Sequence, residues 1–258
     1  MRCFSLILAI MSASVPAFAE SEPMASQVMV VQTIDLHIDN CRQVIRTTTQ
    51  DHPKVLAQFS TFSTTLKQAY VSGEGLIHKD VHKILDSLSF AAQKHHFQKR
   101  KDPENLPYII HPIGVADHLM AIGGVRDTDV IVAALLHDTV EDTDTTFDEI
   151  EKLFGSRVSG FVREVTDDKT LAKQQRKALQ FQHAPEKTAG AAQIKLADKL
   201  NNLTDMAKGP PVDWEPERVD EYFRWAPNVV NRLPWVNAPL KQAVDDVVAG
   251  YWLSKRSN

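Results

Sequence analysis

The chain has 258 residues, of which 43% are hydrophobic, and its formal net charge at neutral pH is −4. This length and composition predict a globular protein with an ample core, organised as one domain plus an extension. The negative charge argues against a general nucleic-acid binder, which is normally basic. Beyond the N-terminus no apolar stretch is long enough to cross a membrane.

The N-terminus has the pattern of a secretory signal. A short charged start precedes the apolar segment Phe4–Met11, and Ala17-Phe18-Ala19 is a small-residue cleavage site. We therefore expect residues 1–19 to be a signal peptide, with an upstream extension ahead of a true start at Met24 as the alternative. Only Cys41 lies beyond this segment, so no intrachain disulfide supports an oxidising compartment.

Residues 20–76 are expected to form an extension of unknown role. They contain one helical-looking stretch, Val55–Tyr70, and a break at Gly73–Gly75. No chemistry is evident in this segment. We expect surface positions for the histidines in and near it, which are His37, His52 and His78.

Residues 77–258 are expected to form the domain proper, and its pattern is helical throughout. Val81, Ile84, Leu85 and Leu88 follow the spacing of an amphipathic helix. No convincing strand alternation appears, so we predict an all-α bundle of eight or more helices. Further helices are expected at 112–122, from a cap at 127 or 128 into the 130–136 run, from 146 to a stop at Gly155, and at 158–165, 171–182, 189–206, 217–233 and 239–253.

The most unusual segment is His137-Asp138-Thr139-Val140-Glu141-Asp142, which follows the apolar run Val130–Leu136 without a break. If the helix continues, His137 and Glu141 share one face, and Asp138 and Asp142 share the adjacent one. Such carboxylates are tolerable at the inner end of an apolar helix only if a cation binds or some of them stay protonated. A metal site is the simpler explanation.

Two other places offer metal ligands. His111 precedes Pro112 and so stands at a helix entrance, and Asp198 lies within the largely apolar helical stretch 194–203. With His137 and Asp138 they make two imidazoles and two carboxylates. This donor set suits Mn, Fe or Zn better than a thiolate-preferring metal.

The pattern of His111, His137-Asp138 and Asp198 resembles the HD-domain metal-dependent phosphohydrolases. Five segments in order resemble the hydrolase half of the Rel/Spo alarmone enzymes, most of all the small stand-alone form, the metazoan SpoT homologues. The resemblance covers roughly residues 85–255. Its segments are Arg100–Pro103, Pro107–Ala116, Ala133–Thr143, Val165–Leu171 and Lys195–Leu200.

The resemblance implies an HD-domain helical bundle that hydrolyses guanosine 3′,5′-bis(diphosphate), ppGpp, at the 3′ ester to GDP and pyrophosphate. It implies one Mn²⁺ ion, with Glu141 and Asp142 as the catalytic pair handling water. The metal ligands that it implies are His111, His137, Asp138 and Asp198. Only residues 199–258 follow the last of these, too few for a synthetase domain, so hydrolysis alone is expected. The family acts in the cytosol in starvation and stringent responses, which disagrees with the signal and leaves the compartment open.

The resemblance also implies a substrate rim. The run Lys94–Lys101 would by composition be a solvated face, but Arg100 and Lys101 match positions that meet the nucleotide's base and phosphates. Asn202 is either a substrate contact or a satisfied core amide. Further substrate contacts are expected from Lys169, Lys173, Arg218 and Tyr222.

Three places depart from the family pattern. Ile110 and Asn201 stand beside site residues where relatives tend to carry other side chains, and we expect them to tune the pocket. The Pro-rich segment Pro234–Pro239 interrupts what is a smoother helix in the family and puts the C-terminal packing in question.

Two rival functions stay open. One is an HD phosphatase acting on another phosphorylated ribose, such as NADPH at its 2′-phosphate. The other is a non-catalytic nucleotide-binding module. In each case the partner is a small-molecule nucleotide rather than nucleic acid or membrane, and the sequence leaves the oligomeric state open.

Overall fold

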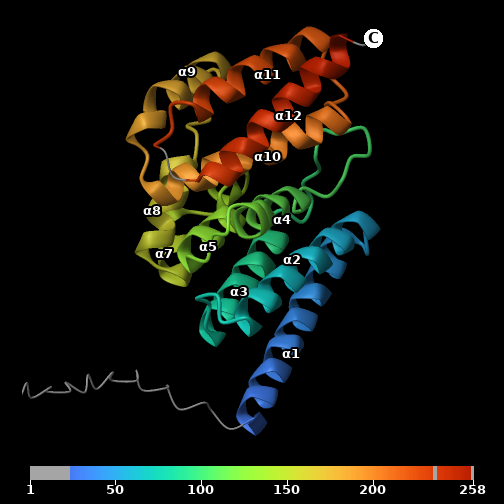
Figure 1. Cartoon of the computed structure of the whole chain (residues 1–258), viewed down its shortest axis with the longest axis vertical. Coiled ribbons are helices and arrows are strands. Elements are labelled where there is room, and N and C mark those ends of the chain that lie inside the picture. The colour runs from blue at the N-terminus through green and yellow to red at the C-terminus, as the bar shows by residue number, and fades with distance from the viewer. Residues whose placement is uncertain (1–23, 235–236, 257–258) are drawn as a thin grey trace, which may run out of the picture.

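The computed structural model describes residues 24–234 and 237–256. All the regular secondary structure assigned within these ranges is helical (Figure 1). Within the same ranges, strand-like pairing is limited to one isolated bridge between Lys99 and Pro107. The predicted all-α fold is confirmed. A membrane-spanning helix, long and apolar enough for a bilayer, does not occur in the described part of the chain. The predicted signal peptide lies outside the described residues.

The extension contains two helices where the sequence indicated one. These are α1 (Met24–Thr49) and α2 (Pro53–Val71), and α2 matches the expected Val55–Tyr70 stretch. Helix α1 was not predicted from the sequence, although its buried side chains recur at helical spacing, at Ile34, Ile38, Cys41 and Ile45. The helix contains no glycine or proline between Met24 and Thr49, so its regular apolar spacing was its main sequence signal.

The extension packs closely on the rest of the chain. Helix α1 lies along α3 (His78–Lys94), and α2 lies against α4 (Ile110–Asp117) (Figure 1). Phe59 and Phe62 of α2 are completely buried and belong to the same hydrophobic core as the later helices. The division at residue 76 therefore follows the family resemblance and not a gap in packing.

The remaining elements form the bundle around the site. They are the π-helix η1 (His118–Ile122), α5 (Thr128–Leu136), α6 (Thr139–Asp142), α7 (Phe147–Phe154), α8 (Ser156–Val165), α9 (Lys173–His183), the 3-10 helix η2 (Ala184–Glu186), α10 (Ala189–Lys208), α11 (Pro216–Val230) and α12 (Ala238–Arg256). The predicted 112–122 helix is thus split into α4 and η1 and begins two residues earlier.

Helix starts largely follow the predicted caps. Asp127 accepts a hydrogen bond from the Asp129 backbone N–H at the start of α5. Thr146 likewise caps α7 by accepting from the backbone N–H of Glu149 at 3.1 Å. Thr146 and Glu149 have the spacing of a capping box, but its reciprocal bond is not formed, because the Glu149 carboxylate pairs with Lys94 instead.

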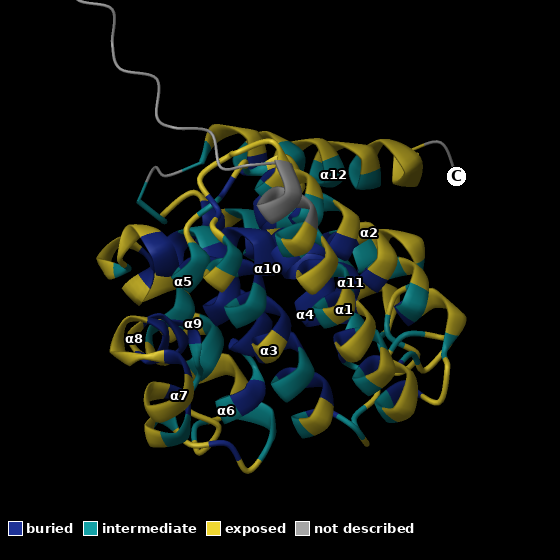
Figure 2. Ribbon diagram, turned by 90° about the horizontal axis from the view of Figure 1, so that it is seen from below, coloured by how far each residue is buried: buried dark blue, intermediate teal, exposed yellow. Residues whose placement is uncertain are grey.

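Two helices at the centre position the site. Helix α10 packs against α4, α5, α8, α11 and α12, and its buried face stands out near the middle of Figure 2. Every residue of α5 from Val130 to Leu136 is buried, as expected of an apolar helix surrounded on all sides. The C-terminal helix α12 packs on α10 through Leu240 and Val244, so the Pro-rich segment before it leaves the bundle closed.

Candidate metal centre and substrate pocket

The helix that carries the HD pair does not continue as a single rod. Helix α5 ends at Leu136, His137 and Asp138 form a turn, and α6 begins at Thr139. The arrangement in which His137 and Glu141 stack on one continuous helix is therefore wrong in detail. The turn brings the neighbouring side chains together, with His137 Nε2 3.1 Å from Asp138 Oδ2.

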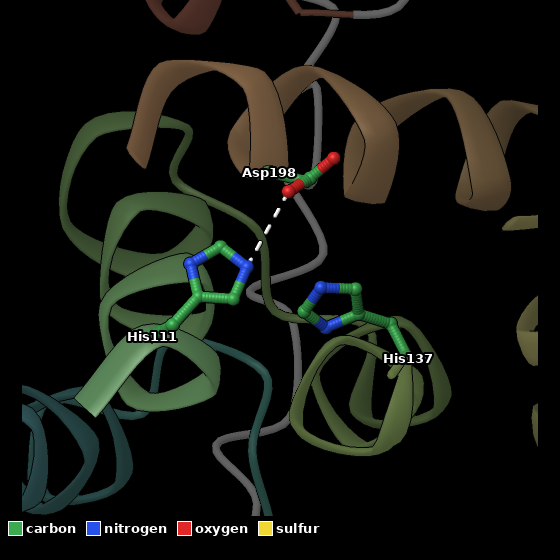
Figure 3. Close-up of side chains that lie close together, drawn as sticks. All are labelled: His111, His137 and Asp198. Carbon is green, nitrogen blue, oxygen red and sulfur yellow. Dashed lines mark ion pairs between the residues drawn. The ribbon is translucent and has the colours of Figure 1, made fainter. Parts of the chain in front are cut away.

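Side chains from three distant segments meet at this turn. The ligating atoms of His111, His137 and Asp198 all lie within 4.8 Å of one another, and Figure 3 shows the three groups converging. His111 Nε2 is 3.4 Å from an oxygen of Asp198 and 3.6 Å from Asp138 Oδ2. Asp138 stands outside the tight group of three but contacts both histidines, and it also accepts a hydrogen bond from Tyr108 at 2.5 Å.

Both imidazoles are held with Nε2 facing the centre. Nδ1 of His137 lies 2.7 Å from the carbonyl oxygen of Ala134, and Nδ1 of His111 lies 2.5 Å from the side-chain oxygen of Asn201. Because each acceptor holds a proton on Nδ1, Nε2 is the nitrogen that faces the cluster, where a bound cation would take the place of a proton. Nε2 of His137 is buried and has no hydrogen-bond partner, which is the condition that a bound cation satisfies. The donor set therefore fits a divalent transition metal.

The electrostatics of the cluster also favour a cation. Burial would lower the pKa of His137, but the Asp138 and Asp198 carboxylates outweigh it and raise the value from 6.5 to about 9. Burial would raise the pKa of Asp198, but Lys199 and His111 hold it well below its ordinary value. Burial would likewise raise the pKa of Asp138, but His137 and His111 lower it by more. Both carboxylates of the cluster therefore stay ionised. The alternative of neutral, protonated carboxylates does not fit these four groups.

The candidate catalytic pair lies on α6 directly beside the cluster. Glu141 accepts a hydrogen bond from the Asp167 backbone N–H at 3.0 Å, and burial and the nearby Asp138 raise its pKa. Asp142 accepts from Gln98 at 2.7 Å and pairs with Lys169. The pair is therefore oriented by other segments and does not simply cap a helix end.

A cavity of about 470 Å³ lies beside the cluster and collects most of the predicted rim. Among the residues that line it are Arg100, Lys101, Lys169, Asn202 and Tyr222, all expected from the sequence. Arg100 donates to Asn202 at 3.2 Å and to Asp205 at 3.0 Å. Asn202 in turn donates to Asp198 at 2.6 Å, so the rim and the cluster are directly connected.

The two remaining predicted substrate residues flank one indole. Lys173 and Arg218 do not line the cavity themselves, but their charged groups lie 5.0 Å and 4.1 Å from the ring of Trp214, which does. Burial and the surrounding cations, of which Arg218 is the largest contributor, lower the pKa of Lys173. The neighbouring positive charges repel one another, and an anionic ligand bound beside them would offset this repulsion.

Sequence reasoning missed three residues of this site. Trp214 lines the cavity from the loop after α10, Tyr108 contacts Asp138, and Gln98 holds Asp142. An aromatic residue closely following Gly209-Pro210-Pro211 was the available signal for Trp214. The other two act through tertiary contacts, which no local pattern reveals.

Comparison with known proteins places these residues in a family context. The model of the HD domain matches residues 87–222. The guanosine-3′,5′-bis(diphosphate) 3′-pyrophosphohydrolases MESH1 of Xenopus tropicalis and Homo sapiens are 55% and 54% identical over 162 and 161 residues. These matches cover 63% and 62% of this chain and 90% of each relative. A solved structure, described as a metazoan orthologue of SpoT that hydrolyses ppGpp and plays a role in starvation responses, aligns with a TM-score of 0.64 at 48% identity. It covers 65% of this chain and 94% of its own.

Proposed function

This chain belongs to the HD-domain family and, within it, to the guanosine-3′,5′-bis(diphosphate) 3′-pyrophosphohydrolases, and from that premise we propose that it hydrolyses ppGpp. Water adds to the phosphorus carried by O3′ and the O3′–P bond breaks, which gives GDP and pyrophosphate. The observation that carries the proposal is the buried meeting of His111, His137 and Asp198, which Asn202 and Tyr108 connect to a nucleotide-sized cavity. By the same reaction the chain lowers the level of a starvation signal.

We propose that His111, His137, Asp138 and Asp198 hold one Mn²⁺ ion. Two imidazole nitrogens and two carboxylate oxygens suit this metal, and the Nδ1 contacts of both histidines leave Nε2 available to it. When bound, the ion supplies Lewis-acid chemistry, because it polarises a phosphoryl oxygen and acidifies water.

The chain's own residues position the water and take its proton. Glu141, with its raised pKa and its bond to the Asp167 N–H, is placed to act as the general base. Asp142 is fixed by Gln98 and Lys169, lines the cavity and is placed to orient the water. Neither group needs to move far, since both are already hydrogen-bonded in place.

The rim binds and orients the substrate. Arg100, Lys101 and Lys169 supply positive charge along the cavity for the diphosphate groups. Lys173 and Arg218 add to this charge from behind Trp214. The Trp214 and Tyr222 rings offer flat apolar surfaces to the base. Asn202, which touches both Arg100 and Asp198, is placed to align the ribose with the ion.

A side-by-side turnover assay tests the proposal. The full chain is loaded with Mn²⁺ and given ppGpp, NADPH or a nucleoside monophosphate in separate reactions. We expect kcat/KM to be highest for ppGpp by at least about tenfold, with GDP and pyrophosphate as products. A preference for NADPH, or binding of ppGpp without turnover, would overturn the assignment.

Substitution of Glu141 separates catalysis from metal binding. In Glu141→Gln the carboxylate that accepts the proton is gone while all four ligand residues remain, so we expect kcat to fall by about 10²–10⁴-fold. Bound Mn²⁺, measured by metal analysis after dialysis, should stay at one equivalent. The matched control Glu149→Gln, on α7 away from the cluster, should retain full activity. Activity in Glu141→Gln close to that of the control would exclude Glu141 as the base.

A further inference from the structure

Three histidines gather where the extension packs on the domain. His37 belongs to α1, and His78 and His82 stand one turn apart on α3. The ring centroid of His82 lies 4.1 Å from that of His37 and 4.2 Å from that of His78. His95, whose ring contacts Tyr108 of the substrate pocket, follows α3 at its other end, roughly 20 Å of helix away. The cluster is therefore separate from the metal centre described above.

Two of these rings face each other through the atoms that bind metals. Nε2 of His78 lies 3.0 Å from Nε2 of His82. An ion about 2.1 Å from both nitrogens would subtend an angle of about 90° between them. This is the angle between neighbouring ligands in octahedral and square-planar coordination, which Ni²⁺ and Cu²⁺ adopt with imidazole ligands.

An oxygen of α1 lies next to these nitrogens. Thr33 Oγ1 is 2.8 Å from Nε2 of His78, and the same hydroxyl donates to the carbonyl oxygen of Val30 at 2.7 Å. Because its proton is engaged with Val30, the hydroxyl presents a lone pair toward His78. A third donor atom, from the opposite helix, is thus in place beside the histidine pair.

The surroundings suit a cation that keeps some of its water. Asp86 lies one turn after His82 and contributes negative charge, bonded to His37 Nε2 at 2.8 Å. A surface cavity lined by His78, His82 and Asp86 leaves room for water ligands. Lys79 and Lys83 also line this cavity, and Lys83 is paired with Asp129 at 2.7 Å. Burial and the neighbouring His37 and His78 lower the pKa of His82, which keeps its ring in the neutral form that binds metals.

We propose that His78 and His82 form a second metal site, specific for an imidazole-preferring divalent ion such as Ni²⁺ or Cu²⁺. Thr33 and water complete its coordination. The donor set lacks the paired carboxylates of the catalytic centre, so the two sites favour different metals. Since Thr33 lies on α1 and both histidines lie on α3, the ion joins the extension to the domain.

Equilibrium dialysis of the full chain against Ni²⁺ tests this site. The catalytic centre, which has two imidazoles of its own, also accepts Ni²⁺ under these conditions. We therefore expect two equivalents bound in the unaltered protein and one in His82→Gln, which removes a nitrogen from a half-buried helix position. His183→Gln is the matched control, because His183 is a half-exposed histidine whose one partner is Glu186, and it should still bind two. Equal numbers of bound ions in His82→Gln and in the control would overturn the proposal. Circular dichroism of both variants verifies the fold, and His78→Gln gives an independent second test of the pair.

The bridging role has its own measurement. Bound Ni²⁺ should slow hydrogen exchange of the α1 amides around Thr33 in the unaltered chain and leave them unchanged in His82→Gln. If Ni²⁺ did not change the hydrogen exchange of these amides in the unaltered chain, the bridge between α1 and α3 would be refuted.

Discussion

At the residue scale, the metal centre depends on side chains that touch no substrate. Asn201 accepts the Nδ1 proton of His111 at 2.5 Å and so decides which nitrogen faces the cluster. The sequence marked Asn201 as a departure from the family that was expected to tune the pocket, without saying how. Its contact with His111 could not be predicted, because it joins α4 to α10 and the sequence pattern of one helix does not indicate which helix packs against it.

Loss of the Asn201 oxygen should loosen the metal. In Asn201→Ala the buried Nδ1–H of His111 has no acceptor, and we expect Mn²⁺ affinity to fall by about 10–100-fold. Asn201→Asp keeps an acceptor oxygen and should bind Mn²⁺ within about tenfold of the unaltered chain. Competition with a fluorescent chelator measures both. Equal losses in the two variants would contradict an orienting role.

The raised pKa of Glu141 predicts the acid limb of the rate. Burial and Asp138 place this pKa above the ordinary value of 4.5. A general base works only when deprotonated, so kcat should be full above this raised pKa and fall as the pH drops through it. A profile of kcat against pH at saturating Mn²⁺ checks the midpoint. The variant Asp144→Asn, an exposed acid nearby, should give the same profile, and a midpoint at or below 4.5 would rule out Glu141 as the titrating group.

At the element scale, most helices could be predicted, because a 3.6-residue apolar period and caps at Asp127 and Thr146 are local signals. The break between α5 and α6 could not. His137 and Asp138 carry no glycine or proline between them, and the turn is stabilised by contacts such as Tyr108 with Asp138. The sequence therefore indicated the candidate metal ligands of this segment but not the turn that positions them.

The close approach of α4 and α10 leads to a prediction about a glycine. A Cβ at Gly114 would lie 2.8 Å from the Asn201 side-chain nitrogen, so Gly114→Ala must displace the amide that holds His111. We expect a loss of about 1–3 kcal/mol of unfolding free energy, measured by urea titration, together with weaker Mn²⁺ binding.

Gly160→Ala is the matched control for this substitution. A Cβ there meets no atom within 4 Å, and the residue lies inside α8. Alanine should therefore stabilise the protein by about 0.5–1 kcal/mol and leave metal binding unchanged. If Gly114→Ala were as benign as Gly160→Ala, the packing of α4 on α10 would not control the metal site.

At the scale of the whole molecule, the packing partner of the extension could not be predicted from the sequence. A helical apolar face indicates that something covers it but does not identify what does, so the contacts of α1 with α3 and of α2 with α4 appear only in the structure. The family resemblance offered no help, because it begins after the extension.

A core shared by both parts predicts one cooperative unfolding transition. Phe62 on α2 is completely buried, and Phe62→Ala should cost about 3–5 kcal/mol of unfolding free energy. All four tryptophans lie at position 214 or later, so their fluorescence reports on the domain while the change lies in the extension. We expect the fluorescence and circular dichroism midpoints in urea to shift together. An unmoved fluorescence midpoint would indicate independent domains, and Leu36→Ala, at an exposed site on α1, is the neutral control.

The positions of the metal ligands along the chain also determine when an ion can be acquired. His111, the 137–138 turn and Asp198 come from α4, the α5–α6 junction and α10, so the last ligand is made long after the first. A nascent chain exposes too few donors to capture the ion tightly, and three helices must assemble before coordination is possible. Metal binding is therefore coupled to the assembly of these helices, and the ion should stabilise the folded chain against unfolding.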